Sequence, residues 1–424
     1  MFINIRNTGK ISQAQIEIKG ITVIAGVNNT GKSTVGKVLF CLFNSFYNID
    51  QQIEQERKFL VSGIIEKHFF RNMGRLVSTL NVHSFAKYII SMKEAYVDNE
   101  ELLTVDLRSL YIQSDKNYEK YLDDSSLSSL SDSILQILNV SNEEIFVTVF
   151  QRRLQAEFNM QINNIYQPDL CSEIVLKIKD TEFTVVIKEN EIISITNNFS
   201  LNTEVIYMDD LLALEEPRHM TNAENHRDHL KSKLFIQHEG SIVQSAIDQI
   251  IAEKKLATVI SKINNICGGE VIRQPNASIF TLAYQESDAE TALDIRNIST
   301  GIKAFVILKT LLQNGSLEDN GIIVLDEPEI HLHPEWQLVF AELIILLQKE
   351  FNMHVLLNTH SPYFLEAIDV FSHKYGIADK CKYYLAENAG RTAIINDVSD
   401  NLEKIYDKLS RPLQVLENER YQDA

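Results

Sequence analysis

The sequence has few cysteines, little positive charge and no long apolar run. Its four cysteines, Cys41, Cys171, Cys267 and Cys381, show no C-x-x-C spacing, which argues against a zinc site or a disulfide framework and suits a reducing compartment. The 58 acidic residues outnumber the 40 basic ones and give a formal net charge of −18. Any contact with nucleic acid would therefore be made by a local basic patch. The start is unlike a signal peptide and no segment could span a bilayer, so we expect a cytoplasmic protein without membrane contact.

The segment from Gly26 to Thr34 matches the phosphate-binding pattern G-x-x-x-x-G-K-[ST] at every required position. It lies between an expected buried strand (21–25) and an expected helix (33–43), as the motif requires. Its backbone N–H groups and the helix N-terminus would hold a polyphosphate. Lys32 would reach the terminal phosphates, and the Ser33 hydroxyl would bind Mg²⁺. The expected nucleotide-binding residues of this segment are Gly26, Asn28, Asn29, Thr30, Gly31, Lys32, Ser33 and Thr34.

Two later apolar strands end in residues that suit phosphate hydrolysis. The run 322–325 ends in Asp326 and Glu327. Asp326 would hold Mg²⁺ through water, and Glu327 would act as the general base on the attacking water. The strand 354–358 leads to His360. In an open α/β sheet such a histidine lies in the ligand crevice, where it could bond a γ-phosphate oxygen.

A third segment supplies another anion site. Ser299 is expected to cap a helix that runs to about Leu312, and Gly301 permits close approach to its N-terminus. The position of this segment shortly before the acidic strand suggests that it completes the nucleotide site of a second subunit. Lys303 either reaches phosphate across that dimer or lies on a solvated helix face.

The region between these motifs has mixed periodicity. The Ser-rich run 123–132 is expected to be an exposed loop, and Ser141 with Glu144 forms a capping box for a helix ending near Phe158. The other expected elements are strands at 2–6 and 14–18, helices within 49–97, an antiparallel meander at 173–196, a strand at 205–208, a helix at 241–266, strands at 271–272, 278–283 and 292–295, and a charged helix at 399–410 that Pro412 ends or kinks.

The order of these motifs resembles that of the ABC-type ATPases of the SMC, RecF and OLD group. Glu-Pro-Glu-Ile-His-Leu-His-Pro at 327–334 and Asn-Thr-His-Ser-Pro at 358–362 are similar to segments of the OLD-like AAA ATPases common in bacterial antiphage defence operons. The resemblance covers 1–43 and 295–368 and implies an α/β fold, an ABC-type P-loop ATPase head with an antiparallel β-subdomain and a large helical insertion. The expected parts are the N-terminal head (1–48), the helical insertion (49–170), a β-meander with a long helix (171–290), the C-terminal head (291–396) and a C-terminal helix (397–424).

Such ATPases sandwich two ATP molecules between two heads. The resemblance therefore implies a homodimer or higher homo-oligomer in which Ser299 and Gly301 of one subunit contact ATP held by the other. The residues holding that ATP and its Mg²⁺ would be Lys32, Ser33, Asp326, Glu327 and His360. Thr300 and Ile302 stand where transporter-type signatures have Gly and Gln.

A glutamine near the inserted helices contacts Mg²⁺ or water in related ATPases. Gln151 is the candidate metal-contacting residue here, and Gln155 and Gln161 compete with it. His331 and His333 have no third ligand nearby in the sequence, so we interpret them as loop residues rather than a metal site.

No nuclease is predicted in this chain. OLD nucleases continue into a Toprim domain with an Asp-x-Asp pair, whereas Asp397 and Asp400 have a different spacing. We expect an ATPase that hydrolyses ATP and acts as a nucleotide-gated dimer controlling a separately encoded nuclease or toxin in antiphage defence. Two alternatives stay open. One is an ATP-dependent scaffold that sequesters the effector with little turnover. The other is a RecF-like or SMC-like DNA clamp in repair, with contacts from Lys67, Arg71, Arg75, Arg152 and Arg153.

Overall fold

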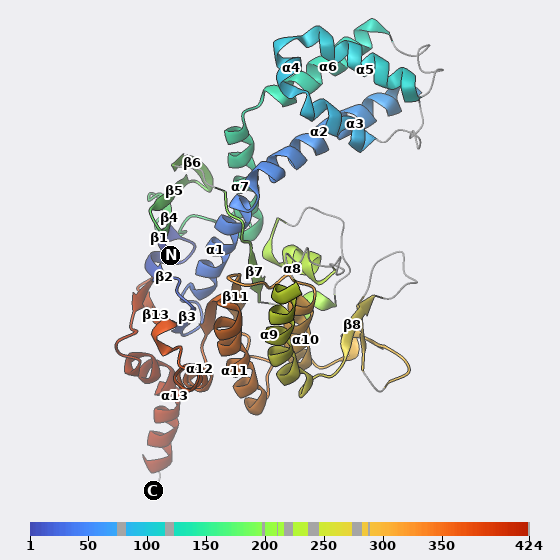
Figure 1. Cartoon of the computed structure of the whole chain (residues 1–424). Helices are drawn as coiled ribbons and strands as arrows, with labels where there is room; N and C mark the ends of the chain where they lie inside the picture. The colour runs from blue at the N-terminus through green and yellow to red at the C-terminus, as the bar shows by residue number, and fades with distance from the viewer. Residues whose placement is uncertain are drawn as a thin grey trace. The chain divides into compact units, whose positions relative to one another are not determined.

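The computed structural model describes residues 1–73, 82–114, 123–196, 200–209, 211–215, 224–235, 246–273, 282–286 and 289–422. The chain divides into two compact units (Figure 1). The head unit comprises Met1–Asn44, Gln151–Phe199 and Thr203–Ala424, and the helical unit comprises Ser45–Phe150 with Ser200–Asn202. The helical unit thus ends before residue 170, the boundary expected from the sequence. Among the described residues, no helix combines the length and the hydrophobicity needed to cross a membrane.

The head is built on one large sheet. Its strands are β1 (Phe2–Thr8), β2 (Ile11–Glu17), β3 (Ile21–Gly26), β4 (Ser172–Ile178), β5 (Thr181–Lys188), β6 (Glu191–Thr196), β7 (Val205–Met208), β11 (Ile322–Asp326), β12 (His354–Thr359), β13 (Cys381–Ala389) and β14 (Thr392–Asp397). They lie in the order β6-β5-β4-β1-β2-β14-β13-β3-β12-β11-β7. The last five, from β13 to β7, run parallel to one another, whereas β13 pairs with β14 on its other side in antiparallel fashion.

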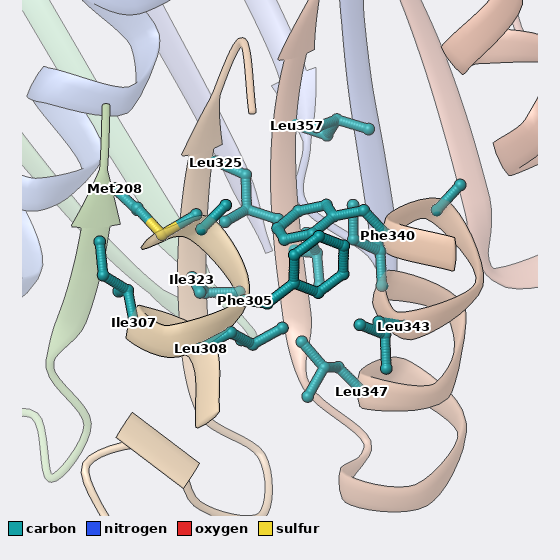
Figure 2. Close-up of a cluster of buried hydrophobic side chains, with 14 of the residues drawn as sticks. Met208, Phe305, Ile307, Leu308, Ile323, Leu325, Phe340, Leu343, Leu347 and Leu357 are labelled. Carbon is teal, nitrogen blue, oxygen red and sulfur yellow. The ribbon is translucent and has the colours of Figure 1, made fainter. Parts of the chain in front are cut away.

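The parallel strands are buried on both faces because their sequences are almost continuously apolar. All residues of β3 and of β7 are buried, which is typical of central parallel strands. Figure 2 shows Phe305 of α10 (Thr300–Gln313) and Phe340 of α11 (Pro334–Phe351) beside Leu325 and Leu357 of the sheet. The two phenylalanine rings pack edge to face with centroids 5.4 Å apart. This core holds β11 and β12 in place.

The antiparallel side of the sheet follows the predicted pattern. β1 and β2 form a hairpin, and β4, β5 and β6 form the meander predicted at 173–196. Buried and less buried residues alternate along β4, as they do where one face of a strand is covered. The strand predicted at 205–208 is β7, which pairs with β11 in parallel.

Further elements complete the head. The remaining helices are α1 (Lys32–Phe46), α7 (Asn142–Glu157), α8 (His226–Leu234), α9 (Ala246–Asn264), α12 (Pro362–Lys374) and α13 (Glu403–Gln422), of which α1 and α7 extend into the helical unit. A second sheet contains β8 (Glu270–Arg273), β9 (Leu282–Gln285) and β10 (Leu293–Asp294). Residues 241–245 of the predicted long helix and 278–281 of a predicted strand lie outside the described residues.

The C-terminal helix differs from the prediction at Pro412. α13 includes this proline instead of ending there. A proline inside a helix removes one backbone hydrogen bond. Because Pro412 is exposed, the carbonyl that loses its partner can bond water, and the helix continues.

The helical unit contains α2 (Ile49–Met73), α3 (Val82–Ser91), α4 (Lys93–Asp98), α5 (Glu100–Ser114) and α6 (Asp124–Asn139). Its core includes Val61 and Ile65 of α2, Ile89 of α3 and Leu107 of α5. The first turn of α7 carries the predicted capping box. Ser141 Oγ accepts from the Glu144 N–H at 3.1 Å, and Glu144 Oε2 accepts from the Ser141 N–H at 3.0 Å.

The Ser-rich run 123–132 is not the exposed loop that we expected. It forms the first part of α6, which Asp123 caps by accepting from the Ser126 N–H. Leu127 and Leu130 are buried. Apolar residues at helical spacing therefore outweigh the low helix propensity of the serines between them.

Candidate nucleotide-binding site

Four parallel strands of the head end at one edge of the sheet. Since β7, β11, β12 and β3 are neighbours in that order, their carboxyl ends meet there, and this edge is where ligands bind in open α/β sheets. The residues that follow β3, β7 and β11 surround a hollow of about 480 Å³, and His360, which follows β12, is not in its described lining. The hollow is lined by Lys10, Asn28, Asn29, Thr30, Gly31, Lys32, Ser33, Thr34, Asp209, Asp326, Glu327 and Ile330. The phosphate loop and the acidic pair, which are far apart in the sequence, are thus neighbours.

The phosphate loop requires a glycine at position 31. Gly31 has a φ of +79°, and a Cβ added there would lie 2.8 Å from Ile11 Cγ1, so a larger residue would be both strained and crowded. Asn29 also has a left-handed φ, of +62°, which asparagine tolerates well. The Thr30 hydroxyl closes the loop by donating to the Val27 carbonyl at 2.8 Å.

Three oxygen atoms lie close to the ammonium group of Lys32. Nζ donates to the carbonyls of Gly26 at 3.0 Å and Val27 at 3.1 Å. It also lies 3.3 Å from Glu327 Oε1, and the lysine side chain is only 4% exposed. His360 Nδ1 lies 3.3 Å from the same carboxylate oxygen. Glu327 is therefore shared between the lysine of the phosphate loop and the histidine that follows β12.

Both carboxylate oxygens of Asp326 accept hydrogen bonds. The Tyr207 hydroxyl of β7 donates to Oδ2 at 2.7 Å, and Asn358 Nδ2 of β12 donates to Oδ1 at 2.9 Å. Burial and the charge of Asp326 raise the pKa of Tyr207 well above its ordinary value, so the phenol stays a neutral donor. No motif points to Tyr207, and the Asn-Thr-His-Ser-Pro segment that contains Asn358 does not indicate a contact with Asp326. Their roles depend on the order of β7, β11 and β12 in the sheet.

The loop after β11 is tied to the loop after β12. Glu327 has a left-handed φ of +51°, which costs about 1–3 kcal/mol. Its N–H donates to the Asn358 carbonyl at 2.9 Å. Glu329 is buried, accepts a hydrogen bond from the Thr359 hydroxyl, and has its pKa raised by burial. These contacts fix the relative positions of Glu327 and His360.

The segment at the start of α10 does not belong to the described lining of this hollow. Ser299 is exposed and caps α10, accepting from the Ile302 N–H at 3.4 Å. A Cβ at Gly301 would lie 2.9 Å from the His331 carbonyl. The glycine therefore allows α10 to approach the loop before α11 within one subunit, whether or not it also contacts a nucleotide.

Lys303 and Gln151 are engaged elsewhere. Lys303 is buried and pairs with Glu215 Oε1 at 2.5 Å, so neither the phosphate contact nor the solvated face expected for it is seen. A lysine on the buried face of a helix needs such a carboxylate partner.

Gln151 donates from Nε2 to the Asn190 carbonyl and accepts at Oε1 from the Ile192 N–H, both at 2.8 Å. It fixes the turn between β5 and β6 and is absent from the described lining, which gives no support to the expected metal contact.

The sequence motifs do not indicate a charged cluster that adjoins the hollow at Asp209. His226 Nε2 of α8 lies 2.9 Å from Asp209 Oδ2, and His226 Nδ1 lies 2.6 Å from Glu157 Oε1. Burial alone would lower the pKa of His226, but its interactions with Asp209 and Glu157 outweigh burial and raise the pKa to about 9. Its ring stacks on Tyr207, with centroids 4.4 Å apart. His226 is thus a cation that connects the buried carboxylate of Glu157 with the partly exposed carboxylate of Asp209.

The sequence around Asp209 contains a pattern that points to this residue. The run 205–208 is apolar and is followed by Asp209, just as 322–325 is followed by Asp326. The similarity indicates a functional aspartate only because β7 lies beside β11 in the sheet.

Comparison with known proteins decides the family. Residues 1–365 match the family model of the AAA ATPase domain. The chain belongs to this family. The predicted P-loop ATPase is thereby confirmed, and the phosphate loop, the acidic strand and the histidine strand all lie within the matched residues.

Two curated relatives of this AAA ATPase domain are retron proteins. A retron Vc95 probable ATPase of Vibrio cholerae serotype O1 biovar El Tor is 31% identical over 156 residues, which are 37% of this chain and 27% of the relative. A retron Ec83 probable ATPase of Escherichia coli is 26% identical over 216 residues, which are 46% of this chain and 39% of the relative. The matches therefore span less than half the length of either relative.

Solved structures give remote likenesses. An SMC head bound to the C-winged helix domain of ScpA has a TM-score of 0.40 and 10% identity, and covers 95% of this chain and 98% of its own. The SMC head domain from Thermotoga maritima has a TM-score of 0.34 and 12% identity, and covers 94% of this chain and 98% of its own.

ATP and Mg²⁺ suit the residues of this AAA ATPase domain. A Cβ at Gly31 would crowd the loop, while Lys32 and Ser33 line the hollow with Asp326 and Glu327. Within the described ranges, no three His, Cys, Asp or Glu side chains are grouped to hold a metal by themselves.

One of the two loop histidines has a structural role. His333 caps α11, its Nδ1 accepting from the Glu335 N–H at 3.4 Å, and Pro334 begins the helix as predicted.

Proposed function

We propose that this AAA ATPase domain binds ATP with Mg²⁺ in the hollow and hydrolyses it to ADP and phosphate. The observation that carries the proposal is the position of Glu327 Oε1, 3.3 Å from both Lys32 Nζ and His360 Nδ1. A carboxylate base, a cation for phosphate and a histidine meet there, beside Asp326. Hydrolysis of a terminal phosphate requires this combination of positioning and charge stabilisation.

In the proposed reaction, water attacks the γ-phosphorus in line with the bond to the β,γ-bridging oxygen, and that bond breaks. Glu327 accepts the proton of the attacking water. Lys32 neutralises charge on the phosphates, and His360 donates to a γ-phosphate oxygen. Mg²⁺, held through Ser33 and Asp326, would supply further positive charge at the phosphate oxygens. Phosphate would compete with Glu327 for Lys32 and so free the carboxylate.

Removal of the metal tests this proposal. The purified chain is expected to release phosphate from ATP in the presence of Mg²⁺, to stop in excess EDTA, and to resume when Mg²⁺ is added back. Phosphate release can be followed colorimetrically, with boiled protein as the control. Hydrolysis that continues unchanged in EDTA, or a chain that hydrolyses no ATP under any of these conditions, would contradict it.

The second part of the proposal is closure of the hollow by another copy of the chain. Ser299 is exposed at the N-terminus of α10, where N–H groups and the helix dipole favour an anion. A helix N-terminus that favours an anion but does not line the hollow of its own subunit suits the phosphate of a second subunit. We therefore place ATP between two copies of the head, in a homodimer or a higher homo-oligomer.

The third part concerns a separately encoded effector. Two relatives are named as retron probable ATPases, and the helical unit exposes Phe59 (67%) and Phe70 (58%) on α2. Exposed aromatic side chains suit a protein partner. We propose that ATP-driven assembly controls a nuclease or toxin in antiphage defence in the cytoplasm, with the helical unit as the adaptor surface.

Co-purification tests that control. Products of neighbouring genes are expected to be retained by the wild-type chain in a manner that changes on addition of ATP. Retention by a Glu327→Gln variant that persists after ATP addition would favour a scaffold that holds its effector with little turnover. Absence of any co-purifying neighbour, with and without ATP, would contradict effector control.

A DNA clamp has less support. Arg152 pairs with Glu224 at 3.4 Å, and burial lowers the pKa of Arg153. The Arg71 side chain and Arg75 lie outside the described part of the chain. No basic face from these residues is therefore established, and we do not propose DNA binding.

A further inference from the structure

Asp209 and Asp326 hold equivalent positions on neighbouring parallel strands. β7 and β11 pair in parallel from Val205 with Ile322 to Met208 with Leu325. The next residue on each strand is an aspartate, and neighbouring strands lie about 4.8 Å apart. Both aspartates line the nucleotide hollow. The edge of the sheet thus presents two adjacent carboxylates toward the phosphate loop.

The two oxygens of the Asp209 carboxylate differ in the partners that the described residues give them. Oδ2 lies 2.9 Å from His226 Nε2 and 3.3 Å from Arg227 Nη2. Oδ1 is buried and accepts no hydrogen bond from any described residue. A carboxylate that is oriented through one oxygen, while the other has no partner in the described part of the chain, is arranged as metal ligands usually are, with an outer group fixing their direction.

His226 is itself held rigidly from the other side. Glu157 accepts from its backbone N–H at 2.9 Å and lies 2.6 Å from its Nδ1. The Glu157 side chain is 0% exposed. The His226 ring stacks on Tyr207, whose hydroxyl donates to Asp326. Asp209 and Asp326 are therefore oriented by one connected cluster of side chains.

We propose that Asp209 is a second carboxylate of the divalent-cation site that accompanies the nucleotide, and that His226 is its positioning residue. The inference rests on the proposed ATP binding and deepens it. Asp209 contacts the cation directly or through one of its waters, and the role expected of Gln151 falls to this residue. One or two carboxylates together with phosphates are the usual protein contribution to bound Mg²⁺.

Binding of a non-hydrolysed ATP analogue tests the role of Asp209. The dissociation constant of adenosine 5′-(β,γ-imido)triphosphate is measured by calorimetry over a range of Mg²⁺ concentrations and in EDTA. The Asp209→Asn variant is expected to bind the analogue in EDTA no more weakly than the wild type. The Mg²⁺ concentration that supports half of the maximal analogue binding is expected to rise about tenfold or more in this variant. A loss of that size is usual when groups around a metal are disturbed.

The matched control is Glu204→Gln at the other end of β7. Glu204 Oε2 lies 2.9 Å from His229 Nε2 of the same helix α8, but Glu204 does not line the hollow in the described chain. This variant is expected to keep the wild-type Mg²⁺ response. Equal Mg²⁺ responses in wild type and Asp209→Asn would overturn the inference and leave ATP binding intact. Failure of the wild type to bind the analogue would overturn the proposed function, and the inference with it.

Two substitutions at His226 separate positioning from folding. The Gln amide nitrogen can replace Nε2 and keep the contact with Asp209, whereas the Asn amide nitrogen can replace Nδ1 and keep only the contact with Glu157. His226→Asn is expected to show the raised Mg²⁺ requirement, and His226→Gln is expected to restore the response toward that of the wild type. Thermal unfolding checks that both variants are folded. An equal Mg²⁺ requirement in the two folded variants would contradict the positioning role.

Discussion

Replacing Glu327 with glutamine is expected to slow ATP hydrolysis by at least about a hundredfold, the lower end of what a general base contributes. The amide keeps the size of the side chain but cannot accept the proton of the attacking water. It also ends the ion pair with Lys32 Nζ, which lies 3.3 Å from Glu327 Oε1. Since Lys32 is then free to hold phosphate, nucleotide binding is expected to be retained or strengthened.

Steady-state phosphate release and analogue binding by the same preparations check this expectation. Glu335→Gln is the control, because the Glu335 side chain is 85% exposed at the start of α11 and is not part of the described lining of the hollow. It is expected to match the wild type in both assays. If Glu327→Gln hydrolyses ATP as fast as Glu335→Gln, Glu327 is not the base and the proposed mechanism is wrong.

Replacing Ser299 with aspartate is expected to have an effect of similar size. Aspartate caps a helix as well as serine does, so α10 keeps its N-terminus. The added negative charge would face the γ-phosphate of the second subunit, and like charges brought together cost several kcal/mol. Hydrolysis is expected to fall by at least about a hundredfold, which corresponds to roughly 3 kcal/mol.

Ser299→Asn separates charge from capping, because asparagine also caps well and is neutral. The comparison is made on ATP turnover at several protein concentrations, with circular dichroism to confirm equal helix content. Ser299→Asp is expected to be far slower than Ser299→Asn. Equal turnover in the two variants would show that no phosphate approaches this helix end.

Much of the site is local in the sequence, and that part could be predicted. The phosphate loop from Gly26 to Thr34, the acidic pair Asp326 and Glu327, and His360 each follow an apolar strand within a few residues. Strand ends of a parallel sheet gather at one edge. Three short motifs therefore predict one site, and the structure places His360 beside Glu327 there.

The rest depends on contacts between distant segments. Asp209 follows the same kind of apolar run as Asp326 does, but its importance comes from the pairing of β7 with β11. Lys303 is buried because Glu215, far away in the sequence, supplies its partner. A metal contact for Gln151 is expected only by analogy with related ATPases, whereas the fold places its amide on the turn between β5 and β6.

Fold details diverged from the prediction where two local preferences compete. The Ser-rich start of α6 has polar composition but apolar residues at helical spacing, and burial of Leu127 and Leu130 decides the outcome. Pro412 removes a hydrogen bond, yet α13 continues through it at an exposed position. In both cases the tertiary environment, rather than composition, fixes the structure.

The central claim is that ATP is held by the hollow of one subunit and closed over by α10 of another. Its most direct test is ATP turnover in an equimolar mixture of a Lys32→Ala variant and the Ser299→Asp variant. Each variant alone is expected to be inactive. The mixture is expected to recover activity, because a mixed dimer contains one site in which both Lys32 and Ser299 are intact. A mixture no more active than the sum of its two components, or a Ser299→Asp variant that is fully active alone, would contradict the account.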